Sequence, residues 1–191
     1  DVSVIDELPP GRKPIETVAI PASRRADVVS RISDACTAGR QAYWVCPLIE
    51  ESETLELETA TDTAQALREA LPDLSIALIH GRMKPPEKEK IMAAFKRGEV
   101  HLLVATTVIE VGVDVPNASV MVVMDADRFG VSQLHQLRGR IGRGGHPGLC
   151  LLVTGTDAEP AMTRLTAVAA TTDGFELARL DLSQRREGDI L

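Results

Sequence analysis

The sequence predicts an α/β fold in which an open, mostly parallel sheet is flanked by helices. Six short apolar runs alternate with segments of helical length, and most of these runs lack strict apolar–polar alternation. Strands that are covered on both faces have this pattern, because neither face meets water. The apolar fraction of 44% is ordinary for a packed core, and with only 3% aromatic residues that core is built mainly from Val, Leu, Ile and Ala.

The six apolar runs are the expected strands. They cover residues 15–20, 42–48, 75–80, 100–105, 120–125 and 149–154. Repeated strand–helix alternation is typical of an open α/β sheet. Such a sheet binds ligands beyond the carboxyl ends of its strands, so the loops after the third, fourth and fifth strands are the candidate binding loops. The order of the strands within the sheet does not follow from the sequence.

Helices are expected between these strands because their ends and apolar faces are recognisable. The first begins near Ser23, as its N-cap, and ends before Gly39. The second covers residues 61–71 and has an apolar face made of Ala60, Ala64, Leu67 and Leu71. The third opens at Pro85 and Pro86 and closes at Gly98, with Ile91, Met92 and Phe95 facing inward. A short fourth helix is expected from Ser132.

The chain divides into three parts. Residues 1–14 end in DELPPGRKP, and their proline and charge content predicts a linker. Residues 15–156 hold all six strands and form the α/β domain. Residues 157–191 have a helical pattern, with an apolar stripe of Met162, Leu165 and Val168, and form a C-terminal helical segment.

Charge is distributed unevenly over an acidic chain. The net charge of -7 argues against a generic DNA-binding module. Residues 50–62 carry six acids and no base, whereas residues 82–97 carry six bases and two acids. Residues 128–156 carry four arginines and no acid. An acidic body with two basic segments is compatible with a focused face for contacting phosphates.

The cysteines, the histidines and the hydropathy of the chain predict the state of its thiols, its metal content and its location in the cell. Cys36, Cys46 and Cys150 are odd in number and far apart, and the last two lie inside apolar runs, so we expect reduced thiols. The four histidines show no ligand spacing, which predicts no metal site. No apolar run is long enough to cross a bilayer and no signal segment opens the chain, so we expect a cytoplasmic protein without a membrane partner.

The most specific string is QLHQLRGRIGRG, at residues 133–144. Its arginines Arg138, Arg140 and Arg143 are separated by Gly139 and Gly142. Glycine lets a backbone approach a ligand closely, and planar guanidinium groups bind phosphate oxygens bidentately. An Arg/Gly-rich surface loop is the alternative interpretation. We favour phosphate binding.

Two further strings follow strand ends. In LLVATTVIEVGVDVPN the strand ends in two hydroxyls, Thr106 and Thr107. A buried strand followed by a loop whose aspartate caps a turn is the simpler explanation of that string. In LIHGRM, Gly81 and Arg82 could offer backbone N–H groups and a guanidinium to an anion, and a simple strand–helix turn explains this string equally well.

Taken together and in this order, the three strings resemble the later motifs of superfamily two helicases. HGRM with its KxxxMxxFKRG helix is similar to the element ahead of motif V, TTVIEVGVDVP to motif V, and QLRGRIGR to the motif VI pattern QxxGRxGR. The stretches DELPPGRKPIET and VCPLIEESE narrow the resemblance, over nearly the entire chain, to the bacterial fork-remodelling helicases. Transcription-repair coupling translocases share RFG and QLRGRIGR, but those two stretches favour the fork-remodelling branch.

The resemblance implies that residues 15–156 are the second RecA-like motor domain of an ATP-dependent translocase that remodels stalled replication forks and branched recombination intermediates. Residues 1–14 would be the interdomain linker. Residues 157–191 would begin a helical hairpin that couples ATP hydrolysis to translocation. Arg186 and Glu187 depart there from the Gly and Pro usual in the family.

Nucleotide-binding roles also come with the resemblance. Arg140 and Arg143 would be arginine fingers that reach the γ-phosphate of ATP, which the preceding domain would hold with Mg²⁺. Such a finger is worth roughly 10³–10⁵ in kcat where its effect has been isolated. Gln136 would sense the γ-phosphate, and Gly112 and Asp114 would lie near the ribose and phosphates.

The same resemblance assigns a DNA contact. Gly81, Arg82, Thr106 and Thr107 would touch the backbone of branched or forked double-stranded DNA, which fixes register without reading sequence.

The sequence departs from a complete helicase motor in one respect that determines whether this chain alone could hydrolyse ATP. No GxxxxGK[ST] phosphate loop occurs in it, so the expected partner is a preceding RecA-like domain of the same polypeptide, and the chain alone is expected to be inactive. A non-catalytic α/β module that binds DNA or a protein would not require Arg140 and Arg143 near a phosphate. A stand-alone Rossmann enzyme is disfavoured, because no GxGxxG follows the first strand.

Overall fold

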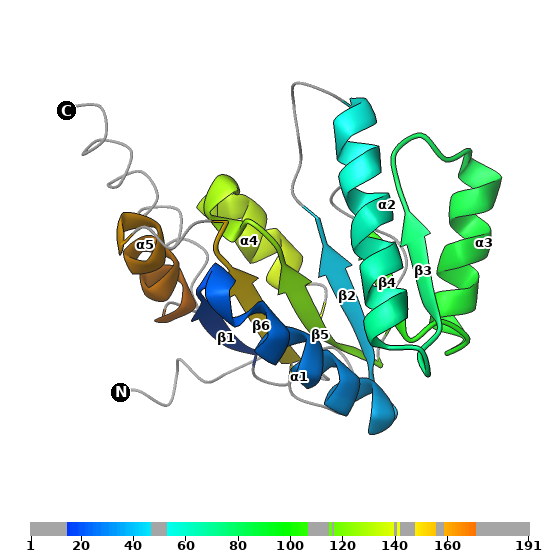
Figure 1. The fold of residues 1–191 in the computed structure, drawn as a ribbon, viewed down its shortest axis with the longest axis horizontal. Coiled ribbons are helices and arrows are strands. Elements are labelled where there is room, and N and C mark those ends of the chain that lie inside the picture. Colours follow the sequence, from blue (N-terminus) through cyan, green and yellow to red (C-terminus); the bar gives the residue numbers. More distant parts are fainter. Residues whose placement is uncertain are drawn as a thin grey trace.

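A single parallel sheet organises the protein. The computed structural model describes residues 15–46, 53–106, 115, 117–139, 141, 148–155 and 159–170. The strands are β1 (Ile15–Ile20), β2 (Gln41–Val45), β3 (Ile76–Ile79), β4 (Leu102–Ala105), β5 (Ala118–Val123) and β6 (Gly148–Val153). Their order is β1-β6-β5-β2-β4-β3, and every neighbouring pair is parallel (Figure 1). The predicted open parallel sheet is confirmed, with strand ends that shift by a few residues.

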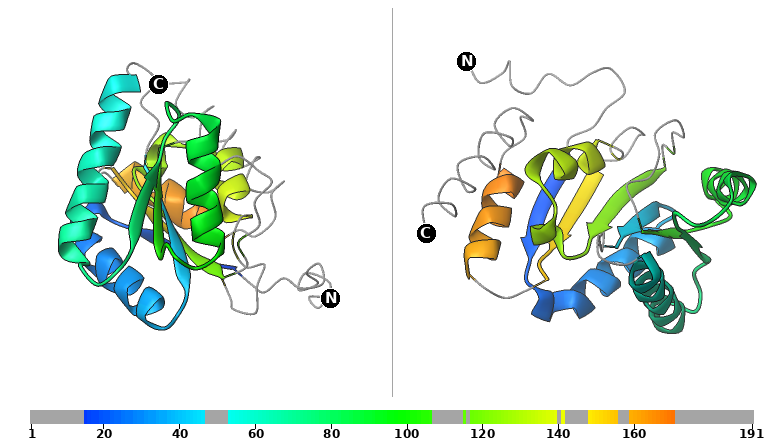
Figure 2. Two further views of the ribbon diagram at one scale, coloured as in Figure 1. Left: turned by 90° about the vertical axis from the view of Figure 1, so that its right-hand side faces the viewer. Right: turned by 90° about the horizontal axis from the view of Figure 1, so that it is seen from above.

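Helices cover both faces of the sheet. Helices α1 (Arg25–Thr37) and α2 (Glu53–Ala70) lie on one face, and α3 (Pro85–Lys96) and α4 (Val131–Arg138) lie on the other (Figure 2). Helix α5 (Glu159–Ala170) packs beside the edge strand β1. Two short 3-10 helices, η2 (Ala22–Arg24) and η3 (Ala126–Arg128), precede α1 and α4. The three-layer arrangement explains why β2, β4 and β5 are buried along their whole length.

Each face of the sheet has its own apolar core. Beneath α1 and α2, residues such as Ile32, Leu67 and Trp44 are almost completely buried. Beneath α3, α4 and α5, Phe95, Leu134 and Leu165 are fully buried in the second core. The predicted apolar face of α2 is confirmed, because Ala60, Ala64, Leu67 and Leu71 all lie in the first core. Aliphatic side chains dominate both cores, as the composition predicts.

Two helix starts differ from the sequence-based expectation. Ser23 is not the N-cap of α1: it lies inside η2, and the residue that caps α1 is Arg24, without a side-chain hydrogen bond. The chain enters through a 3-10 turn after Pro21, which moves the N-cap of α1 one residue onward. Helix α2 begins at Glu53, eight residues before the predicted 61, because its first turns are acidic and lack apolar spacing.

Polar side chains close the amino ends of the strands, Gln41 from a buried position and Asn117 from a more exposed one. The Gln41 side chain is 3% exposed and donates from Nε2 to the carbonyl oxygens of Phe95 (2.5 Å) and Val100 (2.7 Å). Asn117 donates from Nδ2 to the carbonyl oxygen of Gly39 at 2.8 Å. Because these side chains bind backbone carbonyls of neighbouring turns, they hold the lower edge of the sheet as a scaffold.

All three cysteines are buried and none forms a disulfide within the described residues. This confirms the prediction of core thiols for Cys46 and Cys150, and Cys36 is buried as well. Burial raises the pKa of the Cys36 thiol to about 11, so it remains protonated at neutral pH. No helix in the described part of the chain is long and apolar enough to span a membrane.

Candidate functional site

The loop after β3 carries two of the predicted nucleic-acid contacts. Gly81 and Arg82 follow the carboxyl end of β3 and are exposed. No described atom lies within 4 Å of a side chain built at Gly81, and its φ is not in the left-handed region. Neither backbone conformation nor packing against the described residues therefore requires glycine at this position. A missing side chain there leaves room for a ligand to approach the backbone.

Arg82 is oriented by two hydrogen bonds to neighbouring residues. Its backbone N–H donates to Nδ1 of His80 at 3.2 Å, and its guanidinium Nη2 donates to Oγ1 of Thr54 at 3.3 Å. Thr54 lies in the first turn of α2. The guanidinium is therefore held at the carboxyl edge of the sheet, between the β3 end and the start of α2.

Thr106 ends the neighbouring strand β4, and its side chain is buried. Its backbone N–H donates to the carbonyl oxygen of Ile79 at 3.2 Å, so the ends of β3 and β4 stay side by side. The side chain is only 2% exposed, and its hydroxyl has no hydrogen-bond partner among the described residues. A side chain buried this deeply can support the residues that follow β4, but in this arrangement it is not open to a ligand. A nucleic-acid contact by Thr106 stays a prediction.

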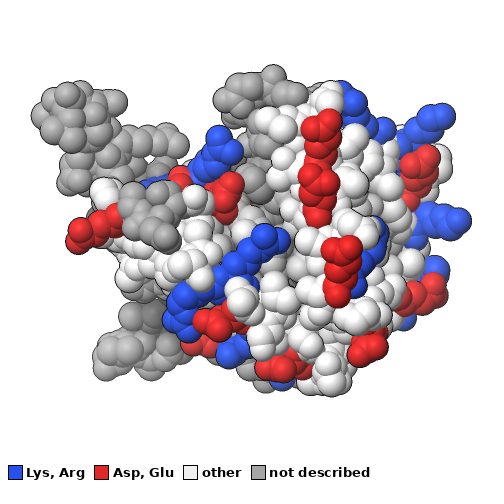
Figure 3. Space-filling view, in the orientation of Figure 1, with Lys and Arg blue, Asp and Glu red and all other residues white. Residues whose placement is uncertain are grey.

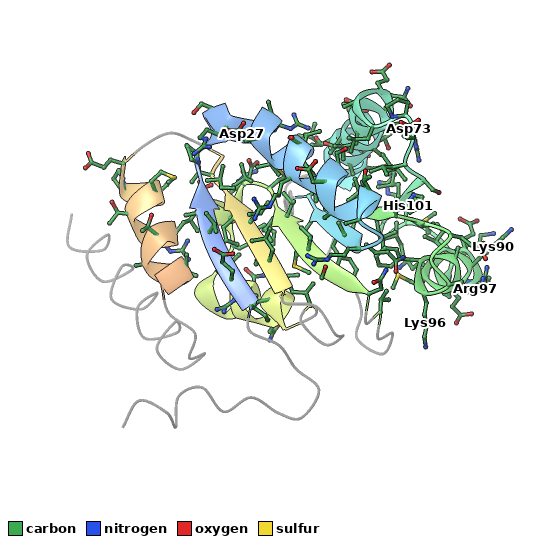
Figure 4. All side chains as sticks on the ribbon, turned by 90° about the horizontal axis from the view of Figure 1, so that it is seen from below. Asp27, Asp73, Lys90, Lys96, Arg97 and His101 are labelled. Atoms are coloured by element: carbon green, nitrogen blue, oxygen red, sulfur yellow. The ribbon has the colours of Figure 1, made fainter. Side chains whose placement is uncertain are left out.

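A basic surface borders this loop, and an acidic one lies beside it. The bases of the predicted basic segment are Arg82, Lys84, Lys88, Lys90, Lys96 and Arg97, and all except the half-buried Lys88 are exposed. Lys90, Lys96 and Arg97 extend from α3 into solvent (Figure 4). The surface view shows acidic side chains in a stripe along α2, and basic side chains interspersed with acidic ones on the α3 side (Figure 3). The bases nearest the loop are Arg82, Lys84 and Lys88, which can attract an anionic ligand to it. Lys96 and Arg97 lie at the far end of α3, where Arg97 pairs with Glu99 at 2.6 Å.

Helix α4 carries the described part of the motif VI string. Its apolar side is anchored in the core, because Leu134 and Leu137 are at most 1% exposed and Ile141 beyond it is fully buried. At its start, Gln133 accepts a hydrogen bond at Oε1 from the backbone N–H of Gly130 at 2.8 Å. This is the reach-back contact of a capping box. The Gln136 side chain is exposed, so an amide that both donates and accepts is presented on a rigid helix.

Helix α4 runs from the carboxyl edge of the sheet down across its face. The buried Arg138 at its end lies close enough to Cys150, in the amino half of β6, to lower the pKa of that thiol. Burial is the larger effect and raises the pKa of Cys150 to about 12, so the thiol stays neutral beside the guanidinium. Of the three arginines in the QLHQLRGRIGRG string, Arg138 is only 6% exposed and therefore lies on the core side of α4.

The turn between β5 and α4 is tightly locked to the end of β6. Asp125 adopts a left-handed backbone conformation with φ 50°. A side chain at Gly155 would come within 2.7 Å of Oδ1 of Asp125, and the Gly155 N–H donates to Oδ1 of Asp127 at 2.6 Å. Burial, and then repulsion from Asp127, raise the pKa of Asp125, against the opposing charge of Arg128. Only glycine fits at position 155 without a shift of this turn.

Helix α5 is tied to the same turn. Nη2 of Arg164 donates to the carbonyl oxygen of Phe129 at 2.9 Å, one residue before the capping glycine of α4. Leu165 and Val168 of α5 are fully buried in the core that also holds Leu134. The predicted stripe on this helix is confirmed for these two residues, whereas Met162 is only half-buried. Helix α5 and the turn before α4 are therefore packed against each other.

The described site residues fall into two groups. The loop group contains Gly81, Arg82 and Thr106 at the ends of β3 and β4, and the helix group contains Gln136 on α4 above β5 and β6. Strands β2 and β4 lie between β5 and β3. At a strand spacing of about 4.8 Å, the end of β3 with Gly81 and Arg82 lies roughly 14 Å from β5, and the end of β4 with Thr106 lies roughly 10 Å from it. Two different ligands, or two parts of one assembly, would be needed to occupy both.

Five predicted site residues lie outside the described residues. They are Thr107, Gly112, Asp114, Arg140 and Arg143. Three residues that the sequence-based interpretation missed shape the described site: His80, Asp125 and Arg164. Only His80 had a signal in the sequence, since it precedes Gly81 in HGRM, whereas the other two are recognised by backbone conformation and a distant contact.

One further hollow lies away from both groups. A hollow of about 440 Å³ opens at the amino ends of β1, β5 and β6 and carries both signs of charge, from Glu16, Arg31, Asp34 and Arg40. It lies at the opposite edge from the loop group. Among the described residues, no three His, Cys, Asp or Glu side chains come together as metal ligands.

Comparisons with known proteins agree with this geometry. Residues 26–145 match the helicase conserved C-terminal domain family. The chain is 57% identical over 193 residues to the ATP-dependent DNA helicase RecG of Escherichia coli strain K12, covering all of this chain and 28% of that relative. It is 52% identical over 204 residues to RecG of Mycobacterium tuberculosis, again covering 28% of it. The chain thus spans less than a third of the length of these relatives.

Solved structures give the same result. A structure of RecG bound to a three-way DNA junction superimposes with a TM-score of 0.77 and 43% identity, over 93% of this chain and 23% of that one. The C-terminal domain of the DEAD-box protein Dbp5 superimposes with a TM-score of 0.56 at 17% identity, which shows the shared fold alone. The RecA-like fold and the resemblance to superfamily two helicases are therefore confirmed, and the chain belongs to the helicase C-terminal domain family.

Proposed function

We propose that this chain is the second motor domain of a RecG-type, ATP-dependent translocase that acts on forked or branched double-stranded DNA. The observation that carries the proposal is the division of the site into two groups. An exposed glycine and arginine at the β3 end lie beside a basic surface, and an exposed amide lies on a helix that leads into an arginine-rich string. One group suits a nucleic-acid backbone, and the other suits a nucleotide phosphate.

In this proposal the helix group serves ATP. The donor set fits a terminal phosphate, since Gln136 offers an amide and the string that follows offers Arg140 and Arg143. The ATP and its Mg²⁺ would be held mainly by a preceding domain, because the chain has no phosphate loop. ATP supplies the free energy that opens and closes the two domains. Gly112 and Asp114 would lie near its ribose and phosphates.

In this proposal, the residues of this chain contribute to hydrolysis by their positions and by their positive charge. Guanidinium groups that reach the γ-phosphate only in the closed state would stabilise the negative charge of the transition state. Burial of Leu134 and Leu137 on α4, and of Ile141 beyond it, supports this role, because a fixed helix would hold groups near its end within the narrow tolerance that such stabilisation requires. Closure thereby becomes a condition for hydrolysis.

The loop group would hold DNA. Gly81 and Arg82 would contact phosphates of the duplex, with Thr106 and Thr107 supporting or extending the contact. Because phosphates carry no sequence information, binding would be insensitive to sequence and strongly dependent on salt. The RecG structure with a three-way junction favours branched DNA as the substrate.

The domain boundaries and the location of the protein stay predictions. We assign residues 1–14 to an interdomain linker, 15–156 to the motor domain and 157–191 to the start of a translocation hairpin. The contact between Arg164 and Phe129 supports a mechanical link between that last segment and α4. We place the full-length protein in the cytoplasm.

The experiment uses the full-length protein that carries this domain. DNA-stimulated ATP hydrolysis and ATP binding are compared for the wild type, Arg143→Ala and the control Arg31→Ala on exposed α1. We expect Arg143→Ala to lower hydrolysis by roughly 10³-fold or more while ATP binding is largely kept, and Arg31→Ala to leave both unchanged. Unchanged hydrolysis in Arg143→Ala would favour a non-catalytic binding module.

A second arm separates the two translocase branches. Hydrolysis by the wild type is measured on forked and on linear duplex at equal phosphate concentration. A preference for forked DNA supports the RecG-type assignment. Equal stimulation by both would favour a transcription-repair coupling translocase.

A further inference from the structure

The turn between β3 and α3 is closed by a side chain that has no assigned role. Nδ1 of His80 accepts the backbone N–H of Arg82 at 3.2 Å, and the carbonyl oxygen of His80 accepts the N–H of Met83 at 3.2 Å. The imidazole thus bonds two residues ahead, as an Asn or Asp side chain does in an Asx-turn. Gly81 and Arg82, the two exposed residues of the loop group, stand inside this turn.

The hydrogen bond fixes the protonation state of the imidazole. Nδ1 can accept only without a proton, so the neutral ring carries its proton on Nε2. The surroundings favour this neutral form: partial burial lowers the pKa of His80 most, Lys88 and Arg82 lower it further, and Glu87 opposes them. The turn is therefore closed by a neutral side chain, which stands between Glu87 on one side of the charge balance and Lys88 and Arg82 on the other.

We propose that His80 is a positioning residue for the DNA contact: its Nδ1 holds the turn that presents Gly81 and Arg82 to a backbone phosphate. The inference rests on the proposed DNA-binding role of the loop group. It assigns to His80 an effect on DNA affinity that acts through Arg82 and not through its own contact with DNA. Loss of the acceptor would release the Arg82 backbone and spread its guanidinium over more conformations.

Direct contact is the competing explanation, and it uses the other ring nitrogen. A neutral imidazole that accepts at Nδ1 keeps a donor at Nε2, which could reach a phosphate by itself. Two amide substitutions separate the nitrogens. An asparagine places its amide oxygen near the position of Nδ1 and can still accept the Arg82 N–H, whereas a glutamine places its amide nearer the position of Nε2.

The chain offers a matched control at the opposite edge of the sheet. Nδ1 of His101 accepts the backbone N–H of Ser75 at 2.8 Å, next to the amino end of β4 (Figure 4). The two histidines therefore make the same kind of bond, one at each end of neighbouring strands. Substitution of His101 removes an equivalent bond far from the loop group.

The test measures ATP hydrolysis by the full-length protein as a function of duplex DNA concentration. The variants are His80→Ala, His80→Asn, His80→Gln, His101→Ala and Arg82→Ala. We expect His80→Ala and His80→Gln to raise the DNA concentration for half-maximal hydrolysis by roughly two- to tenfold, the effect of one ordinary hydrogen bond. His80→Asn should stay within about twofold of the wild type, as should His101→Ala. The rate at saturating DNA should be kept throughout.

Each other outcome overturns the inference in a distinguishable way. Rescue by glutamine and not asparagine would show direct contact through Nε2. A fall in the saturating rate in all three His80 variants would show a general structural role. An effect of Arg82→Ala without any effect at His80 would overturn the inference alone. No effect of Arg82→Ala would instead remove the DNA-binding role of the loop group, and the inference with it.

Discussion

The loop group and the helix group are built in opposite ways on the same sheet. At the β3 end, Arg82 is exposed and is oriented by long hydrogen bonds of 3.2 and 3.3 Å on the edge strand of the sheet. On α4, Gln136 is carried by a helix whose apolar side is sealed into the core by Leu134 and Leu137. A contact with a mobile duplex tolerates small adjustments, whereas a phosphate sensor must be held to fractions of an ångström. The difference in anchoring therefore matches the difference in proposed task.

The largest effect on stability should come from the anchor of the helix group. Leu134→Ala removes a fully buried side chain and should lower the free energy of unfolding by about 2–5 kcal/mol. Chemical denaturation of the purified protein measures the change. The control is Leu55→Ala on α2, where the side chain is 49% exposed and about 0.5 kcal/mol or less is expected. Similar losses at both positions would contradict a rigid anchor for α4.

Gly155, at the turn before α4, and Gly81, in the loop group, should respond differently to substitution by alanine. Gly155→Ala forces a side chain against Asp125 and should cost about 1–3 kcal/mol of unfolding free energy. The cost should shrink in an Asp125→Ala background, where the clashing carboxyl is gone. Gly81→Ala meets no described atom and should change stability by less than about 1 kcal/mol, while weakening DNA binding. Destabilisation by Gly81→Ala alone would assign that glycine to folding.

The link between α5 and α4 should contribute moderately. Arg164→Ala removes the hydrogen bond to the Phe129 carbonyl and should cost about 1 kcal/mol of unfolding free energy. If the bond also couples the two helices, the variant should hydrolyse ATP more slowly at saturating DNA. Arg164→Lys keeps the charge and should recover part of both effects. A change in stability without any change in hydrolysis would limit Arg164 to a structural role.

The smallest effect depends on pH. The pKa of Asp125 is raised in the folded state by burial and by Asp127, so folding takes up a proton, and this contribution to stability is complete below the unfolded pKa. It is lost as the pH rises through the folded pKa. Asp125→Asn should therefore stabilise the protein near pH 7 by at most about 1 kcal/mol, with a smaller gain near pH 3. Thermal unfolding at both pH values measures this. An equal gain at both would assign the effect to the left-handed backbone, which asparagine also tolerates.

The sequence was sufficient for the fold because its signals are local. Apolar runs without alternation identify strands covered on both faces, and Pro85 and Gly98 mark the ends of α3. The early turns of α2 were not predicted, because Glu53 and its neighbours have no apolar spacing. The strand order and the burial of Arg138 could not be predicted from the sequence, because they depend on contacts between distant segments.

The sequence predicted which residues belong to the candidate site, but it did not predict how they are arranged in space. Gly81, Arg82 and Gln136 were identified from motif strings, and all three are exposed as a binding role requires. Their division into two groups depends on β2 and β4 lying between β5 and β3, which no local pattern reveals. The role of His80 in the turn likewise depends on a hydrogen-bond geometry that the string HGRM does not specify.

The division of labour between the two groups is tested most directly by comparing Arg82→Ala with Gln136→Ala in the full-length protein. Arg82→Ala should raise the DNA concentration for half-maximal ATP hydrolysis and reduce the salt dependence of DNA binding by about one phosphate contact, with the saturating rate kept. Gln136→Ala should lower the saturating rate, on the order of 10²-fold, with the half-maximal DNA concentration kept. If both variants changed the same parameter, the two groups would form one site, and the separation of DNA binding from phosphate sensing would be contradicted.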